Sequence, residues 1–130
     1  MLKARILLIE DNEQNRYLAQ FLLERRGHEV IPAATGPIGL ESAVRVQPDL
    51  ILLDIQLPCM DGYDVARALK ADPRSRSVPI IAVTSYAMPG DREKCAEAGA
   101  EGYLEKPIHP ETFVDEIERH LRSPPRQDDP

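Results

Sequence analysis

The chain has 130 residues, which suits one domain with a single core, and 42% of them are hydrophobic, an ordinary share for a globular protein. The formal net charge of −6 implies an acidic surface, so we expect neither nucleic acid binding nor docking on anionic membranes. The sequence contains no apolar stretch of membrane-spanning length and no signal-peptide pattern, so we expect a cytoplasmic protein.

The first part of the chain predicts two strand–helix units. The apolar run at Ile6–Ile9 lacks the alternation of a half-exposed strand, which is typical of a central strand in a parallel sheet. Apolar residues then recur at helical spacing before the stop signal of Gly27 (Leu18, Phe21 and Leu22). A weaker strand is expected at Glu29–Ala33, and a second helical stripe ends before Pro48 (Leu40, Ala43 and Val44).

The rest of the chain repeats this order. Leu50–Leu53 and Ile80–Val83 predict buried strands, with a helix between them that follows Gly62. The segment Asp91–Ala98 is helical by propensity but weakly apolar, so we expect it to be the least firmly packed helix. A weak strand at Gly102–Glu105 and a last apolar helical stripe complete the series (Phe113, Ile117 and Leu121).

This alternation of strands and helices predicts an α/β fold with right-handed crossovers. In such folds, ligands bind at the carboxyl ends of the strands. Polar residues stand at these ends after four of the predicted strands: Glu10, Asp11, Asp54, Thr84 and Lys106. We therefore expect three carboxylates, one hydroxyl and one ammonium to meet at one edge of the sheet.

Three neighbouring carboxylates need positive charge. Each pair repels by about 4 kcal/mol at about 4 Å and an effective dielectric constant of about 20. Mg²⁺ prefers oxygen ligands and is usually held by one or two carboxylates, water and phosphate oxygens. Together with the ammonium of Lys106 it would balance the three acids, so that a phosphate could approach a carboxylate.

The segments around these residues match a known family: LLIEDN, LILLDIQLPCMDG, VTS and YLEKPI. From Lys3 to about Arg122 the chain resembles the receiver domains of two-component response regulators, above all single-domain regulators of the cell-polarity type and receiver modules of hybrid histidine kinases. The resemblance implies a flavodoxin-like fold, a doubly wound five-stranded parallel sheet in the order 2-1-3-4-5 with five helices. We expect this domain over residues 1–122 and a disordered tail over residues 123–130.

The resemblance also implies roles for individual residues. Asp54 would accept the phosphoryl group as an acyl phosphate. Asp11, Asp54 and the main-chain carbonyl of Gln56 would bind Mg²⁺ directly, and Glu10 would hold it through water. Lys106 would pair with a phosphoryl oxygen.

Further residues would transmit or shape the response. The hydroxyl of Thr84 would bind another phosphoryl oxygen, and the aromatic ring of Tyr103 would move in behind it. The Lys106–Pro107 bond is expected to be cis, and Gly62 is expected where a Cβ would be strained.

Two side chains would flank the line along which water attacks the acyl phosphate. Gln56 is polar and can orient a water molecule, whereas Tyr86 is bulky and can exclude it. Steric exclusion acts on every approaching water, so we expect Tyr86 to dominate and the phosphate to be long-lived. The histidines are scattered and are expected to lack partners and catalytic or metal roles (His28, His109 and His120).

The predicted function is that of a signalling protein and not of an enzyme. The phosphoryl donor would be a histidine kinase or a phosphotransfer protein. The target would be a protein that contacts the fourth helix, fifth strand and fifth helix of a monomer or weak dimer (Tyr103, Ile108 and Phe113). Two alternatives stay open: a degenerate receiver that binds without phosphate, and a small phosphohydrolase. A flavin carrier is disfavoured because no glycine-rich phosphate loop follows the first strand.

Overall fold

The structure is a computed structural model that describes residues 3–58, 60–85 and 88–121. Five parallel strands form one sheet in the order β2-β1-β3-β4-β5, which confirms the predicted fold class. The strands are β1 (Arg5–Ile9), β2 (Glu29–Ala33), β3 (Leu50–Asp54), β4 (Ile80–Thr84) and β5 (Gly102–Glu105). The helices are α1 (Glu13–Arg25), α2 (Gly36–Val46), α3 (Gly62–Ala71), α4 (Asp91–Glu97) and α5 (Phe113–Leu121). The predicted tail lies outside the described residues.

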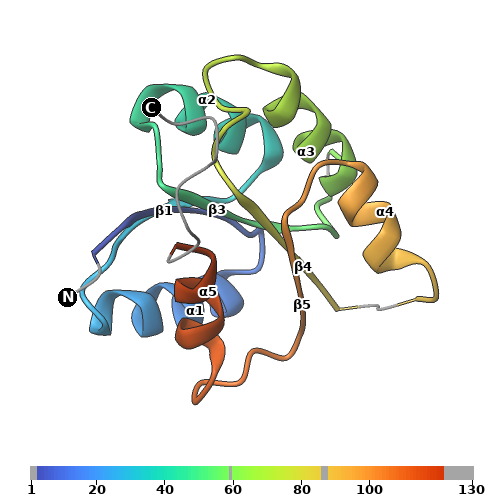
Figure 1. The fold of residues 1–130 in the computed structure, drawn as a ribbon. Coiled ribbons are helices and arrows are strands. Elements are labelled where there is room, and N and C mark those ends of the chain that lie inside the picture. The colour runs from blue at the N-terminus through green and yellow to red at the C-terminus, as the bar shows by residue number, and fades with distance from the viewer. Residues whose placement is uncertain (1–2, 59, 86–87, 122–130) are drawn as a thin grey trace.

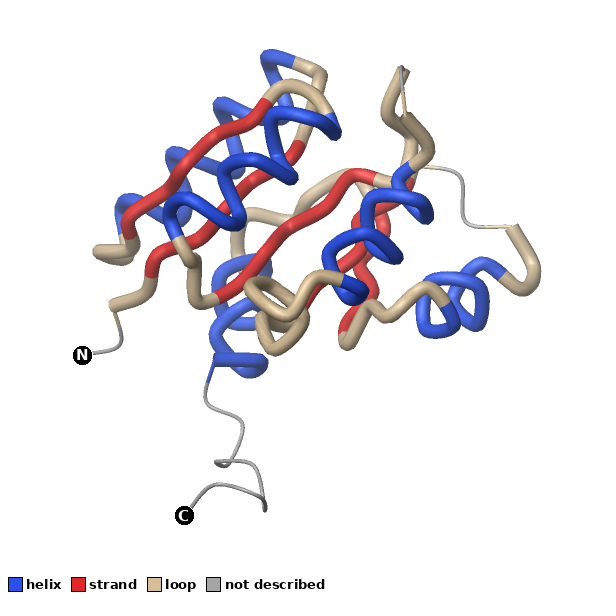
Figure 2. Tube along the Cα trace, turned by 90° about the horizontal axis from the view of Figure 1, so that it is seen from above, coloured by secondary structure: helices blue, strands red, loops and turns tan. Residues whose placement is uncertain are grey.

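Helices cover both faces of the sheet, with α1 and α5 on one side and α2, α3 and α4 on the other (Figures 1 and 2). Successive residues of β1 point to opposite faces, so that Leu8 packs with α1 and α5 whereas Leu7 packs with α2 and α3. Two buried faces explain why the central strands are apolar without alternation. Among the described residues, no helix is long and apolar enough to cross a membrane.

The two edge strands have the weakest apolar patterns. In β2, Glu29 and Pro32 are exposed, and β5 has no fully buried residue. Proline is rare in central strands because it lacks a backbone N–H for the sheet. The sequence pattern and the position in the sheet therefore agree.

Helix α4 is only seven residues long, and Cys95 is its one buried residue. It begins after Gly90, whose backbone is left-handed with φ of 89°, and no side chain caps its first turn. The prediction that this helix is the least firmly packed is thus supported by how little of it is buried.

The prediction that His28 lacks partners is wrong. His28 is buried between β2 and α5, where its Nδ1 accepts a hydrogen bond from the backbone N–H of Ala4 at 3.1 Å. Because that N–H can only donate, Nδ1 carries no hydrogen, and Nε2 is left to donate to the Glu118 carboxylate at 2.8 Å. Arg26 binds the other Glu118 oxygen at 3.0 Å. The histidine therefore ties the start of β2 to the last helix.

Gly62 lies where the loop after β3 turns into α3. Its N–H donates to the carbonyl of Ile55 at 3.1 Å. A Cβ at this position would overlap Ile55 Cα and would lie 2.7 Å from the Ile55 oxygen and 2.8 Å from the Asp54 oxygen. These obstacles are backbone atoms, so they cannot move without shifting the end of β3. The expectation that Gly62 occupies a place closed to a Cβ is confirmed.

We predict that Gly62→Ala lowers the free energy of unfolding by about 1–3 kcal/mol, the usual cost of overpacking. It should also shift the amide NMR signals of Asp54 and Gln56, because the added Cβ pushes on the backbone beside them. Gly99→Ala is the control, since its φ of 111° makes it strained but its nearest obstacle is the flexible Lys70 side chain. Unchanged Asp54 and Gln56 signals in Gly62→Ala would contradict the prediction.

Candidate functional site

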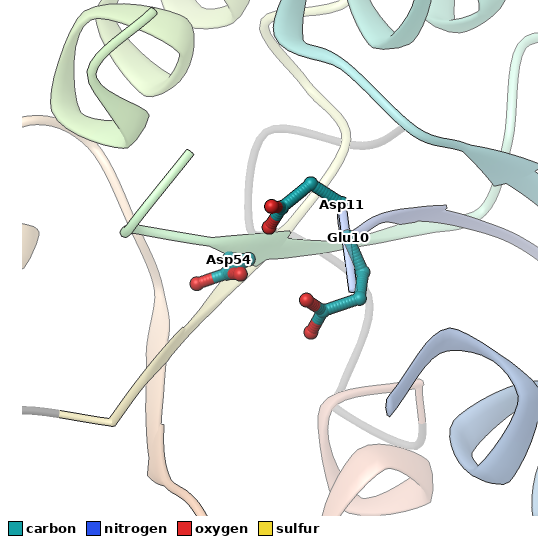
Figure 3. Close-up of side chains that lie close together, drawn as sticks. All are labelled: Glu10, Asp11 and Asp54. Carbon is teal, nitrogen blue, oxygen red and sulfur yellow. The ribbon is translucent and has the colours of Figure 1, made fainter. Parts of the chain in front are cut away.

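Three carboxylates meet at the carboxyl ends of the adjacent strands β1 and β3 (Figure 3). Glu10 and Asp11 follow β1, and Asp54 is the last residue of β3. One oxygen from each side chain lies within 4.8 Å of the others. Glu10 and Asp54 are buried, whereas Asp11 is exposed, so the cluster opens to solvent on one side.

Backbone hydrogen bonds hold the first two acids in place. The N–H of Glu10 donates to Ala33 of β2 at 3.0 Å, which continues the sheet by one residue. The Glu10 carboxylate accepts from the N–H of Asn12 at 3.1 Å, and Asn12 is itself the residue that caps α1. Arg16, one turn into this helix, donates to the Glu10 carbonyl at 2.8 Å. The start of α1 thus fixes the loop that carries Glu10 and Asp11.

Lys106 brings a positive charge to the acids. Its Nζ lies 2.8 Å from Glu10 Oε1 and 3.3 Å from Asp54 Oδ2, and its side chain is 11% exposed. Burial alone would lower the pKa of Lys106, but the hydrogen bond to Glu10 and the charge of Asp54 raise it above its ordinary value. Lys106 is therefore an ammonium in this site. The backbone N–H of Lys106 also donates to the Thr84 carbonyl at 2.8 Å, and the Lys106–Pro107 peptide is cis.

The carboxyl group of Asp54 is hard to ionise. Its burial, followed by the hydrogen bond and negative charge of Glu10, raises its pKa from 3.8 to about 6. The charge of Lys106 and the N–H of Gln56, which donates to Asp54 Oδ1 at 2.9 Å, act in the opposite direction. The balance leaves Asp54 ionised at neutral pH but close to its titration range.

The side chain of Gln56 contacts the end of the neighbouring strand β4. Its Nε2 donates to Thr84 Oγ1 at 2.6 Å, and its Oε1 accepts from the N–H of Ser85 at 2.9 Å. Sequence reasoning assigned Gln56 a metal-binding carbonyl and a role toward water, and it missed this contact. The two partners are 28 and 29 residues away in the sequence, so no local pattern marks them.

The residues predicted to transmit the signal or to contact a target differ in how far they are exposed. Tyr103 on β5 is half-buried, with the guanidinium of Arg92 lying 4.6 Å from its ring centre. Ile108 is also half-buried, but Phe113 is only 2% exposed because it packs between α5 and the sheet. The expectation that Phe113 lines a contact face is therefore wrong. Tyr86 lies outside the described residues.

The site carries an unbalanced negative charge. The formal charges of the three carboxylates and the Lys106 ammonium sum to −2, which one divalent cation would neutralise. Carboxylate oxygens that lie this close together are suitable ligands for a hard cation such as Mg²⁺. The donor set therefore fits the metal expected from the sequence, with Asp11 on the solvent side.

Comparisons with known proteins show the family of this chain. The family model of the response regulator receiver domain matches residues 6–118. The polar-differentiation response regulator DivK of Brucella ovis is 42% identical over 116 residues, which cover 89% of this chain and 94% of that protein. The DivK protein of Brucella suis matches to the same extent.

Solved structures show the same fold. The receiver domain of the sensor histidine kinase PA1611 from Pseudomonas aeruginosa, with a magnesium ion coordinated in its active-site cleft, superposes with a TM-score of 0.85 at 38% identity. That match covers 94% of this chain and 100% of the other. The chemotaxis protein CheY4 of Vibrio cholerae gives a TM-score of 0.85 at 29% identity, over 91% of this chain and 98% of its own. With its acid cluster and its lysine at the ends of the strands, this chain belongs to the receiver-domain family of two-component response regulators, of the cell-polarity type.

Proposed function

We propose that Asp54 accepts a phosphoryl group from the phosphohistidine of a histidine kinase or phosphotransfer protein, in a reaction that requires Mg²⁺. The observation that carries this proposal is the setting of Asp54. Its carboxylate lies at the end of the central strand β3, 96% buried, with the Lys106 ammonium on one oxygen and the Gln56 N–H on the other. Such a group is held in a fixed orientation beside the positive charge that a phosphoryl group needs.

The transfer itself asks little of the protein beyond position and charge. An oxygen of Asp54 forms a bond to phosphorus while the P–N bond of the donor breaks, and the imidazole nitrogen keeps that electron pair. The Lys106 ammonium already lies 3.3 Å from Asp54 Oδ2, so it can bind a phosphoryl oxygen with little movement. Glu10, held by Asn12 and Lys106, keeps the ammonium in place.

Asp11, Asp54 and the main-chain carbonyl of Gln56 would hold the Mg²⁺ directly, and Glu10 would hold it through water. The bound ion would neutralise charge on the transferring group and on the acids. The exposure of Asp11 supports its role as the ligand that meets the incoming ion. The magnesium in the PA1611 receiver domain supports the choice of ion.

Phosphorylation would signal through contact with a target protein and not through catalysis on a small molecule. The surface formed by α4, β5 and α5 supports this role, because Tyr103 and Ile108 are only half-buried there. The effect of phosphorylation would reach this surface through Thr84, the last residue of β4, whose carbonyl accepts a hydrogen bond from the backbone N–H of Lys106. The donor and target would both be proteins, and we propose a cytoplasmic site of action.

We predict that acetyl phosphate with Mg²⁺ adds one phosphoryl group to the wild-type protein and none to Asp54→Ala, as measured by intact-mass spectrometry. The reason is that the side chain lost is the proposed nucleophile. Asp64→Ala is a suitable control, because this acid lies on the exposed side of α3 in an ion pair with Arg67. Equal uptake of phosphate by Asp54→Ala and wild type would reject the proposed acceptor.

We predict that Asp11→Asn weakens Mg²⁺ binding more than the roughly tenfold loss that follows removal of an outer-shell partner, because a direct ligand is lost. Isothermal titration calorimetry without phosphodonor measures this affinity. Asp64→Asn again controls for the loss of one negative charge. An affinity as high as that of the wild type would show that Asp11 does not bind the ion.

The raised pKa of Asp54 predicts a pH-dependent loss of stability in the metal-free protein. Because the folded-state pKa of about 6 exceeds the ordinary value of 3.8, folding favours the protonated acid, and stability falls as the pH rises from about 4 to above 6. Asp54→Asn removes this loss. It should therefore be more stable than wild type by about 3 kcal/mol above the folded-state pKa, with little difference below pH 4.

Urea unfolding in EDTA between about pH 3.5 and pH 8 measures this difference. Asp64→Asn, measured in parallel, shows what the loss of an exposed carboxylate does by itself. If the free energy of unfolding of Asp54→Asn exceeded that of the wild type by the same amount at every pH, titration of Asp54 would not be the cause.

A further inference from the structure

The side-chain amide of Gln56 acts like an added peptide group between β3 and β4. The last backbone hydrogen bond between these strands runs from the N–H of Ile55 to the carbonyl of Val83 at 3.0 Å. Beyond it, the Gln56 amide accepts from the N–H of Ser85 and donates to the hydroxyl of Thr84. One side chain thus joins the loop after β3 to the residue expected to sense the phosphate.

The chemistry of the contacts fixes the direction of each hydrogen bond. The backbone N–H of Ser85 can only donate, so the Gln56 atom that it meets at 2.9 Å is the amide oxygen. The atom that lies 2.6 Å from Thr84 Oγ1 is then the amide nitrogen, which can only donate. The Thr84 oxygen is the acceptor in this pair, so the hydrogen of its own hydroxyl does not point to the Gln56 nitrogen.

We propose that Gln56 is a positioning residue that sets the hydrogen-bond polarity of Thr84, so that this hydroxyl presents its hydrogen to the phosphoryl group on Asp54. The inference rests on the proposed phosphorylation of Asp54. Phosphoryl oxygens only accept hydrogen bonds, so a hydroxyl turned to offer its hydrogen binds them, whereas one that offers its oxygen repels them.

The backbone connections make Gln56 suited to this task. Its N–H holds Asp54 Oδ1, so the same residue contacts the phosphoacceptor and the hydroxyl. The backbone N–H of Lys106 holds the carbonyl of Thr84. The Gln56 side chain contacts Thr84 through the hydroxyl instead. An amide engaged at both ends is also a poor partner for an attacking water, in contrast to the role considered from the sequence.

The test uses Gln56→Met, which keeps the length of the side chain and removes both polar groups. In the unphosphorylated protein with EDTA, the Ser85 amide should exchange about fivefold faster than in wild type, as expected for the loss of one hydrogen bond. Gln20→Met is the matched control, because Gln20 is also half-buried but lies on α1 and binds Glu24. Thermal unfolding of each variant shows that it is folded.

The decisive measurement is the affinity for beryllofluoride, a phosphoryl analogue, in the presence of Mg²⁺, followed by amide NMR signals in four proteins. These are wild type, Gln56→Met, Thr84→Val and the double variant. We expect Gln56→Met to weaken binding about fivefold in the wild-type background, the lower end of coupling between sites, and to have no effect when Thr84 is already Val.

Two results would overturn the inference while leaving the proposed function intact: wild-type affinity in Gln56→Met, or an equal loss in both backgrounds. The first would mean that the contact does not orient Thr84, and the second that Gln56 acts independently of the Thr84 hydroxyl. A different result, in which beryllofluoride changes wild type and Asp54→Ala alike, would reject the phosphoacceptor itself and the inference with it.

Discussion

The ammonium of Lys106 is the charge on which the site depends. It lies between the two buried carboxylates, Glu10 and Asp54, at the end of an apolar sheet. Without it, two adjacent negative charges would be buried together, an arrangement that costs several kcal/mol per ion unless it is compensated. Lys106 follows the edge strand β5, and Glu10 follows β1, which lies on the other side of β3 and β4 in the sheet. The ion pair between Lys106 and Glu10 therefore connects the ends of two strands that are not neighbours. The compensation is partial, and the remaining negative charge attracts a cation.

The same partial compensation helps to set the pKa of Asp54. If positive charge fully compensated the buried carboxylates, Asp54 would be a weakly basic carboxylate. Without any such compensation, Asp54 would be a protonated acid, which cannot attack phosphorus. A pKa of about 6 lies between these limits, so the proposed phosphoacceptor is ionised at neutral pH. The parallel sheet makes this balance possible, because it brings the ends of four strands to one edge while the helices exclude water from both faces.

Sequence patterns predicted the fold well because the strands of this sheet are either buried on both faces or weak at the edges. Ile6–Ile9 and Leu50–Leu53 needed only their apolar character to be recognised. The acids and Lys106 were found because each follows a strand directly. The Gln56 contact with Thr84 and the His28 contact with Glu118 were not found, since side chains 28 and 90 residues apart meet only after the sheet has formed. Phe113 was misplaced because it was assigned to a contact face although it belongs to the same apolar stripe as Ile117, which packs against the sheet.

Pro32 in the edge strand β2 has a consequence for the protein in a crowded cell. The carbonyl of Ala33 faces β1, where it accepts from Glu10 at 3.0 Å, so the neighbouring Pro32 directs its nitrogen to the open edge. This nitrogen carries no hydrogen, and a strand from another molecule would find a gap in the ladder at that point. The open edge of β2 is thereby a poor template for sheet extension. The protein is in this way protected against aggregation through its own backbone.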